Sequence, residues 1–324
     1  MRLLTITISC LLAVLSARAD GPPGVLSLLV ENDVIAGTDR HYTSGVMLAY
    51  VSDINRGPRK AERFGRRLPF LDDDDDIHIS FALGHEIYTP AEITEPDLIV
   101  TDRPYAGYLY GAVGFTTSDA DDTSTWRLDF GIVGPSARGK EIQRGLHRRI
   151  DTYEPRGWSH QLKDEPVLNA VYEKKWRLLP PRQNTVLAVD LLPHLGGAVG
   201  NLQRYVNAGL TLRIGRHLES DYGPPRIRPA LPGSLFFNPK DGPTWYFYAG
   251  VDGRYVEHNL FLDGNTWKHS HSVDKLHWVG DVQAGFVINT RALRLAYSFV
   301  WRSREFRLQE ERNRFGSLTL AYRF

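Results

Sequence analysis

The feature that most restricts the fold of this chain is an alternation of apolar and polar residues with a period of two. Four segments near the C-terminus show it best, and in each of them the apolar residues fall on one face. These residues are Trp245, Phe247, Ala249, Val251 and Tyr255; Val282, Ala284, Phe286 and Ile288; Leu293, Leu295, Tyr297, Phe299 and Trp301; and Leu318, Leu320, Tyr322 and Phe324. Such spacing is typical of β-strands whose two faces meet different surroundings.

A soluble β-sandwich would alternate in the same way, but three features favour a membrane barrel. The segments have about ten residues, enough to cross a bilayer at a tilt. Aromatic residues lie near their ends, as in the interfacial girdle of a membrane barrel. The chain ends inside a strand at Phe324, and pairing with the first strand would close the sheet there. A mean hydropathy of −0.32 fits a barrel, because only every second strand residue is apolar.

We therefore predict an all-β fold, a closed antiparallel transmembrane β-barrel of about twelve strands with a short helix in an external loop. The predicted strands are 24–34, 43–53, 76–86, 105–117, 124–134, 168–178, 184–194, 203–215, 243–256, 277–288, 292–303 and 313–324. An even count places both termini at the periplasmic side. The outward connections are then 35–42, 87–104, 135–167, 195–202, 257–276 and 304–312. The long inner connections 54–75 and 216–242 either contain small helices or indicate an error in the count.

The N-terminus reads as a secretory signal peptide, residues 1–19, followed by a single outer-membrane barrel domain, residues 20–324. Arg2 precedes an apolar stretch, and Ala17-Arg18-Ala19 has the small-x-small pattern of a cleavage site. Cys10 is the only cysteine, so the exported protein would have no disulfide. The 39 basic and 38 acidic residues nearly balance, which gives no reason to expect a nucleic-acid partner.

Residues 30–45 combine amide, carboxylate and hydroxyl groups at the mouth of the first hairpin. Asn32 and Asp33 end the first strand, and Asp39, Thr43 and Ser44 follow. Clustered oxygen ligands suit calcium, although the same residue types are ordinary in hairpin loops. The acidic run Asp72 to Asp76 is read as a solvated loop, because strand parity places it at the other end of the barrel.

The longest external connection contains a predicted helix, Lys140 to Ile150. Ile142, Leu146 and Ile150 recur at the spacing of one apolar helix face. His147 lies on that face beside Leu146, with Arg144, Arg148 and Arg149 around the outside. A histidine on a helix can be purely structural, whereas its place in a cation-rich external loop favours a catalytic role.

The chain closely resembles a known family, the outer-membrane lipid A 3-O-deacylases of Gram-negative bacteria. Its motifs occur in order along nearly the whole mature chain: Glu31-Asn32-Asp33, Thr38 to Gly45, Gly84 to Pro90, Asp102-Arg103-Pro104-Tyr105-Ala106-Gly107, Gly134 to Ala137, His147, Gly157-Trp158, Gln161-Leu162, Gly200-Asn201 and Arg213-Ile214-Gly215. The resemblance implies a twelve-stranded barrel, Ca²⁺ as cofactor and hydrolysis of the acyl ester at the 3-position of lipid A.

Site residues follow from the same resemblance. It implies Asn32 and Asp33 at the calcium site and His147 as the catalytic histidine. Glu154 is our choice for the acid that follows the histidine, and Ser44 for the site serine. His85 stands where the family has glutamine, which leaves its role open.

These residues allow hydrolysis by an activated water. His147 can take a proton from water and return it to the leaving alkoxide, while Glu154 orients the imidazole. A calcium ion would polarise the ester carbonyl, and the chain has no Gly-x-Ser-x-Gly motif. Arg103, Arg144 and Arg148 would bind lipid A phosphates or simply solvate their loops. His269 and His271 are read as loop residues.

Two other functions remain open from the sequence. A porin or adhesin-like barrel would need no His147, and an outer-membrane phospholipase would share the barrel and the calcium but use a serine nucleophile. The expected partner is lipopolysaccharide in the bacterial outer membrane, with the active site facing the outer leaflet.

Overall fold

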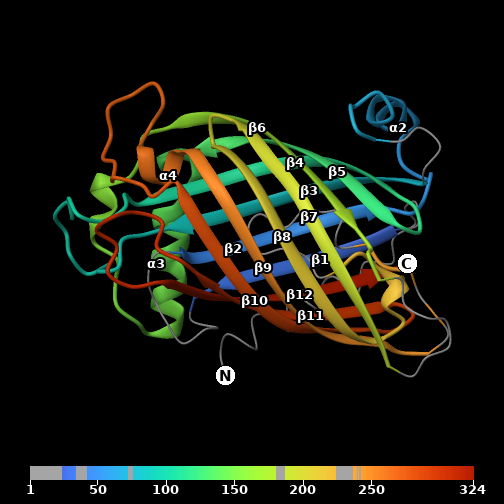
Figure 1. Ribbon diagram of the computed structural model, residues 1–324. Helices are drawn as coiled ribbons and strands as arrows, with labels where there is room; N and C mark the ends of the chain where they lie inside the picture. Colours follow the sequence, from blue (N-terminus) through green and yellow to red (C-terminus); the bar gives the residue numbers. More distant parts are fainter. Residues whose placement is uncertain are drawn as a thin grey trace.

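The computed structural model describes residues 24–33, 42–71, 76–179, 187–223, 236–238, 240 and 242–324. Within these residues twelve antiparallel strands form one closed barrel (Figure 1). The strands are β1 Gly24–Asn32, β2 Tyr42–Ser52, β3 Asp76–Tyr88, β4 Ala106–Ser118, β5 Asp122–Val133, β6 Glu165–Trp176, β7 Ala188–Gly200, β8 Gln203–Arg216, β9 Thr244–Asn259, β10 Trp278–Asn289, β11 Leu293–Arg302 and β12 Asn313–Arg323. The predicted fold class is confirmed. The predicted signal peptide and Asp72 to Asp75 lie outside the described residues.

The first and last strands close the barrel. β1 pairs with β2 on one side and with β12 on the other, from Val25 opposite Arg323 to Asn32 opposite Gly316. Closure leaves no strand with an unpaired edge, which the apolar interior of a membrane requires.

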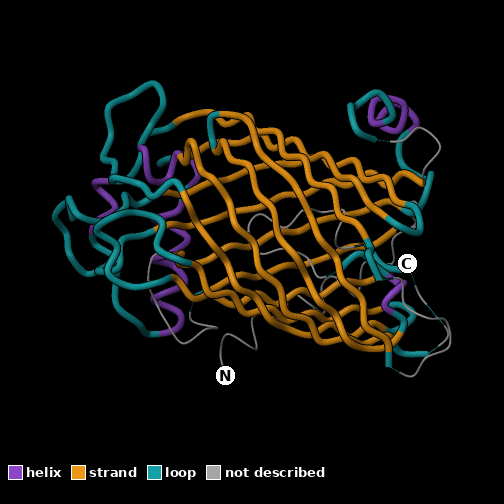
Figure 2. The backbone as a smooth tube through the Cα atoms, in the orientation of Figure 1, coloured by secondary structure: helices purple, strands orange, loops and turns teal. Residues whose placement is uncertain are grey.

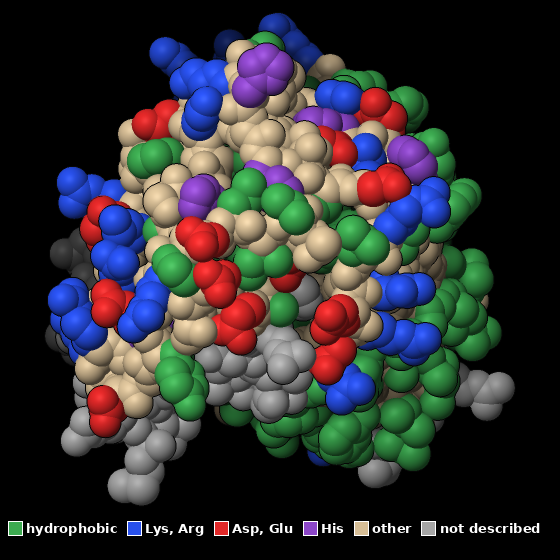
Figure 3. Space-filling view, turned by 90° about the vertical axis from the view of Figure 1, so that its left-hand side faces the viewer, with side chains coloured by type: hydrophobic (Ala, Val, Ile, Leu, Met, Phe, Trp, Pro, Cys, Tyr) green, Lys and Arg blue, Asp and Glu red, His purple; other side chains and the backbone are tan. Residues whose placement is uncertain are grey.

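Burial alternates along the strands as the sequence predicts. In β9, Tyr246 and Tyr248 are buried inside the barrel, whereas Phe247 and Val251 are more than half exposed on its outer wall. The outer wall is largely hydrophobic, as the right-hand flank in Figure 3 shows. Among the described residues, no helix is long and apolar enough to span a membrane.

The one strand placed poorly by the sequence is β7, predicted at 184–194 and observed at Ala188–Gly200. Gly196 and Gly197 suggest a loop, but they lie inside the strand. A Cβ on Gly196 would come within 2.7 Å of the Tyr172 carbonyl oxygen. These glycines therefore serve close backbone packing, and Asn201 and Leu202 alone connect β7 to β8.

The barrel interior is polar and filled with ion pairs. Arg127 donates to Asp129 at 2.5 Å, and Arg213 donates to Asp190 and Asp221, all of them buried. Burying an isolated charge costs far more than burying a compensated pair. Each of these arginines is therefore held beside a carboxylate.

The two ends of the barrel are built differently (Figures 1 and 2). The termini rim is the end where β1 begins and β12 ends. Its connections contain α2, Arg59–Gly65, and the short 3₁₀ helix η4, Leu218–Ser220, so the expected small helices in the long inner connections are confirmed. Phe236 and Phe237 pack there against residues of β1 and β2.

The opposite end, called the α3 rim, is formed by residues 89–105, 134–164, 260–277 and 303–312. It carries α3, Gly139–Ile150, and α4, Leu260–Asp263, together with the 3₁₀ helices η2, Pro135–Ala137, and η3, Gly157–His160. Figure 3 looks onto this rim, where acidic side chains gather near the middle and Lys and Arg side chains lie toward both sides.

Candidate active site

The helix α3 begins against the outer wall of the barrel, not in its lumen. Gly107 at the start of β4 faces outward, and a Cβ there would come within 2.9 Å of the Gly139 backbone nitrogen. His85 shares the outward face of β3 with the exposed Leu83, and its Nε2 hydrogen-bonds the Ala137 carbonyl at 2.8 Å. Two glycines thus allow helix and strand backbones to touch, and His85 fixes the turn that leads into the helix.

The buried face of α3 is polar. Its buried residues are Gly139, Gln143 and His147, whereas Ile142 on the predicted apolar face is 47% exposed. In the structure His147 is thus on the buried face of the helix, whereas Ile142 is not. Leu146 and Ile150 of the same stripe are partly buried, so the apolar stripe borders a buried face that carries the polar groups.

His147 is held in one tautomer by the backbone. Its side chain is 4% exposed, and Nδ1 lies 2.6 Å from the Tyr153 carbonyl oxygen. A carbonyl only accepts hydrogen bonds, so Nδ1 must carry the proton. In the neutral imidazole this leaves Nε2 as the proton acceptor, the state that a general base requires.

Gln143 is a candidate site residue that the sequence did not reveal. It lies one helical turn before His147 on the same buried face. The buried Trp158 donates from Nε1 to Gln143 Oε1 at 2.8 Å, which orients the amide group. The Nε2 of Gln143 is buried without a hydrogen-bond partner in the described part of the chain. The signal in the sequence was its position four residues before the histidine.

Glu154 does not make the contact expected of it. Its side chain is 59% exposed and lies 3.4 Å from Arg144 Nε, and no hydrogen bond or ion pair joins it to His147 among the described residues. The Tyr153 carbonyl provides the orienting contact instead. This contact comes from a backbone carbonyl, which every residue has. The sequence around Glu154 therefore could not reveal it.

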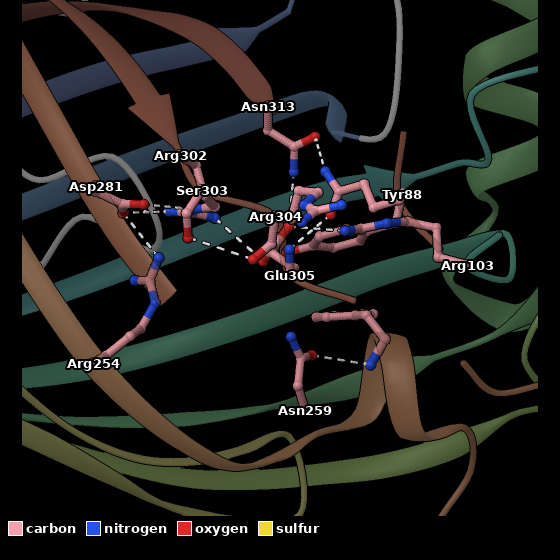
Figure 4. Close-up of polar contacts among 12 residues, drawn as sticks. Tyr88, Arg103, Arg254, Asn259, Asp281, Arg302, Ser303, Arg304, Glu305 and Asn313 are labelled. Carbon is pink, nitrogen blue, oxygen red and sulfur yellow. Dashed lines mark hydrogen bonds and ion pairs between the residues drawn. The ribbon is translucent and has the colours of Figure 1, made fainter. Parts of the chain in front are cut away.

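The three predicted phosphate-binding arginines are placed differently. Arg148 is exposed on α3, and Arg144 is partly exposed beside Glu154. Arg103 is only 2% exposed and pairs with Glu305 at 2.8 Å inside the α3 rim (Figure 4). The guanidinium is thus engaged by Glu305, while its Nε is buried without a hydrogen-bond partner among the described residues.

Strand register brings the first-hairpin residues toward the same region of the outer wall. Asn32 lies directly opposite Ser44, Ser44 is paired with Ile87, and Ile87 is paired with Gly107. These residues form a row across β1, β2, β3 and β4 that ends where α3 begins. Asp33 follows Asn32 at the end of β1 and is fully buried.

Other candidate ligands are dispersed. His269 is exposed, and His271 Nε2 lies 2.7 Å from the Asp102 carbonyl oxygen. Within the described residues, no three His, Cys, Asp or Glu side chains are grouped closely enough to hold a metal ion.

Comparison with solved structures supports this architecture. The chain is similar to LpxR from Salmonella typhimurium, with a TM-score of 0.77 and 21% identity over 93% of this chain and 100% of that one. The β domain of the Bordetella autotransporter BrkA matches at a TM-score of 0.44 and 12% identity, covering 94% of this chain and 98% of its own. None of the curated proteins compared matches the chain.

The family comparison extends over almost the entire sequence. Residues 4–324 match the family described as outer membrane protein LpxR. The closed barrel of twelve strands agrees with that match. The chain therefore belongs to the LpxR family of outer-membrane lipid A 3-O-deacylases.

Proposed function

We propose that this protein hydrolyses the 3-O-linked acyl ester of lipid A in the outer leaflet, with His147 as general base and calcium as cofactor. The observation that carries the proposal is the hydrogen bond from His147 Nδ1 to the Tyr153 carbonyl. It leaves Nε2, on the buried face of α3, able to accept a proton from water.

The reaction needs only water as nucleophile. His147 Nε2 takes one proton from water as the oxygen attacks the ester carbonyl carbon, and then returns it to the alkoxide when the ester C–O bond breaks. The products are the free acid and lipid A with a 3-hydroxyl. Gln143 Nε2, buried and oriented by Trp158, is suited to donate to the carbonyl oxygen as negative charge develops there.

The residues at the end of β1 fit a calcium ion. Asn32, Asp33 and Ser44 offer amide, carboxylate and hydroxyl oxygens, the donors that a hard cation prefers, and register places Asn32 opposite Ser44. A calcium ion bound there would supply Lewis-acid polarisation of the ester carbonyl.

Simple geometry supports a shared site. His147 lies eight positions after Gly139, which is about 12 Å along a helix. Ser44 and Asn32 are two and three strands away from Gly107, or about 10–14 Å at the usual strand spacing. α3 begins at Gly107 and also contacts β3, and these similar spans support our proposal that His147 lies near this pair.

The position of α3 also supports a lipid substrate. An ester that reaches the outer face of the wall comes from the bilayer and not through the lumen, so we propose that the α3 rim faces outward and that lipid A enters laterally. Arg148 and Arg144 lie on the same helix and are suited to the phosphates of lipid A.

The test is mass spectrometry of lipid A from cells that express the protein. We expect loss of the mass of the 3-linked acyloxyacyl group with the wild type and no loss with His147→Ala. His269→Ala, at an exposed histidine of the same rim, is the matched control. A heat-modifiable band on electrophoresis would show that each variant folds. Full deacylation by His147→Ala would eliminate the general base assigned here.

Calcium dependence is tested separately. Excess chelator should stop turnover by the wild type, and added calcium should restore it. Asp33→Ala should reduce calcium binding, measured directly by calorimetry on the folded protein. Turnover that persists in chelator would contradict the cofactor assignment.

The two alternative functions make different demands. A porin would need an open polar lumen, whereas buried pairs such as Arg127–Asp129 and Arg213–Asp190 occupy this interior. A phospholipase would release fatty acid from glycerophospholipid. The same mass spectrometry, extended to phospholipids, distinguishes it from a lipid A deacylase.

A further inference from the structure

The ion pair between Arg103 and Glu305 lies outside the chemistry just described and joins two external loops that are 202 residues apart. We propose that Arg103 and Glu305 are positioning residues, which hold residues 89–105 in place and, through them, α3 with His147 and Gln143. The proposal rests on the proposed function of α3.

The Glu305 side of the pair is rigidly anchored (Figure 4). Its Oε2 accepts hydrogen bonds from Arg103 and from Asn313 Nδ2, both at 2.8 Å. Arg302 lies 3.7 Å from Oε1 and makes two hydrogen bonds to Asp281. Glu305 is thereby connected to β10, β11 and β12, which belong to the closed barrel.

The Arg103 side is tied to both ends of its loop. Asp102 accepts from the Arg103 amide and from the Ala91 amide, each at 2.7 Å. The Arg103 guanidinium also lies over the Phe306 ring, 5.5 Å from its centre. Movement of Arg103 would therefore disturb the whole connection between β3 and β4.

The loop in turn holds the segment that follows α3. The Ile93 carbonyl accepts from the Tyr105 hydroxyl at 3.1 Å and from the Arg156 amide at 2.8 Å. The Tyr105 carbonyl accepts from the Leu162 amide at 2.9 Å. Two carbonyls of one loop thus fix both sides of the short helix η3.

The last contacts reach the site itself. The Tyr105 and Trp158 rings pack with their centres 4.9 Å apart, and Trp158 donates to Gln143. Gln143 and His147 share the buried face of α3. A continuous series of packed and hydrogen-bonded groups therefore connects Glu305 to the two residues proposed to act on the ester.

Buried pairs of this kind are sensitive to the loss of one partner, which leaves an uncompensated charge inside the protein. Displacement of a catalytic group by about 1 Å can reduce the rate by about 10²-fold. A positioning role therefore predicts a large effect on kcat. A direct phosphate contact from Arg103 predicts an effect on KM instead.

The experiment measures lipid A deacylation by full-length protein in micelles. We expect Glu305→Gln and Arg103→Gln each to lower kcat by about 10²-fold with KM nearly unchanged. The double variant should lose no more activity than either single variant. Arg103→Lys should retain part of the activity. Arg307→Gln is the matched control, because its pair with Asp274 in the same region is about 70% exposed and such pairs contribute little.

A second measurement does not depend on activity. Amide hydrogen exchange of residues 139–162 should be faster in Glu305→Gln than in the wild type and unchanged in Arg307→Gln. Normal exchange with full kcat in Glu305→Gln, or a rise confined to KM in Arg103→Gln, would overturn the proposal. If Glu305→Gln fails to fold, Arg103→Lys still tests the proposal: a wild-type kcat together with wild-type exchange of residues 139–162 in that variant would overturn it. A wild type without deacylase activity would refute the proposed function, while the exchange comparison would still decide whether the pair holds α3.

Discussion

At the scale of single residues, the site depends on side chains whose orientation is set by groups that have no catalytic function. The Tyr153 carbonyl selects the tautomer of His147, and the Trp158 indole orients Gln143. Each contact is local in space but joins α3 to the segment that follows it. Reactive groups held in this way need little reorganisation when charge develops.

The first prediction concerns Gln143. Gln143→Ala removes the buried amide donor and should lower kcat by about 10²–10³-fold, the usual effect of losing one oxyanion donor, with little change in KM. The measurement is steady-state deacylation of lipid A.

Trp158→Phe is the companion variant, because it keeps the amide and removes only the indole donor that orients it. A smaller loss of kcat is expected there. An unchanged kcat in Gln143→Ala would show that its amide does not take part in the reaction.

The second prediction concerns Asp263 at the end of α4. Burial alone would raise the pKa of this carboxyl, but hydrogen bonds from His258, Lys275 and the Asn259 amide outweigh that effect and lower the pKa to about 2. A lowered pKa means that these contacts stabilise α4 at all pH values above the ordinary range for aspartate and are lost only as the pH falls toward about 2.

A carboxyl carbon NMR titration of Asp263 measures this directly. The midpoint should lie near 2 in the wild type and should rise in Lys275→Met, because a cationic hydrogen-bond donor is removed. An unchanged midpoint in Lys275→Met would show that the lysine contact is not made in solution.

At the scale of elements, the placement of α3 depends on the contact between Gly107 and Gly139. The third prediction is that Gly107→Ala displaces the start of α3, since its Cβ would lie 2.9 Å from the Gly139 nitrogen and 3.0 Å from its Cα. Both obstacles are backbone atoms, so the helix itself must move. We expect a loss of activity in a barrel that still folds.

Gly253→Ala is the matched control, because a Cβ on this glycine of β9 would meet no atom within 4 Å. Activity and heat-modifiable migration are measured for both variants. Equal activity of Gly107→Ala and Gly253→Ala would show that α3 tolerates displacement from the wall.

The elements also show what a sequence can reveal. Strand faces were predictable because the alternation records which residues meet lipid, as for Phe247 and Tyr248 in β9. The buried face of α3 was not predictable. An apolar stripe through Ile142 indicates an apolar neighbour, but it does not distinguish protein from lipid. The pairing of Arg103 could not be predicted for another reason: its partner Glu305 is 202 residues away in the chain, and the fold of the barrel brings the two together.

At the scale of the whole molecule, the two rims have different tasks. The α3 rim carries the proposed site, and the termini rim closes the base of the barrel with buried charges. Asp221 is the centre of that base: it accepts from Arg213 Nη1 at 2.5 Å, from Arg294 and from the Tyr246 hydroxyl. Stability and catalysis should therefore be separable by mutation at opposite ends.

The fourth prediction tests that separation with Asp221→Asn. The substitution keeps the shape of the side chain but leaves Arg213 and Arg294 with less compensation in a buried place, which should lower the free energy of unfolding by about 3–5 kcal/mol. Urea unfolding of the folded barrel in lipid measures the loss. Asp274→Asn, at the exposed pair with Arg307, should change it by no more than about 0.5 kcal/mol.

Because Asp221 lies at the end opposite to α3, the folded fraction of Asp221→Asn should keep the kcat of the wild type. A fall in kcat per folded molecule would mean that the base of the barrel is coupled to the site, and that the two rims do not act independently.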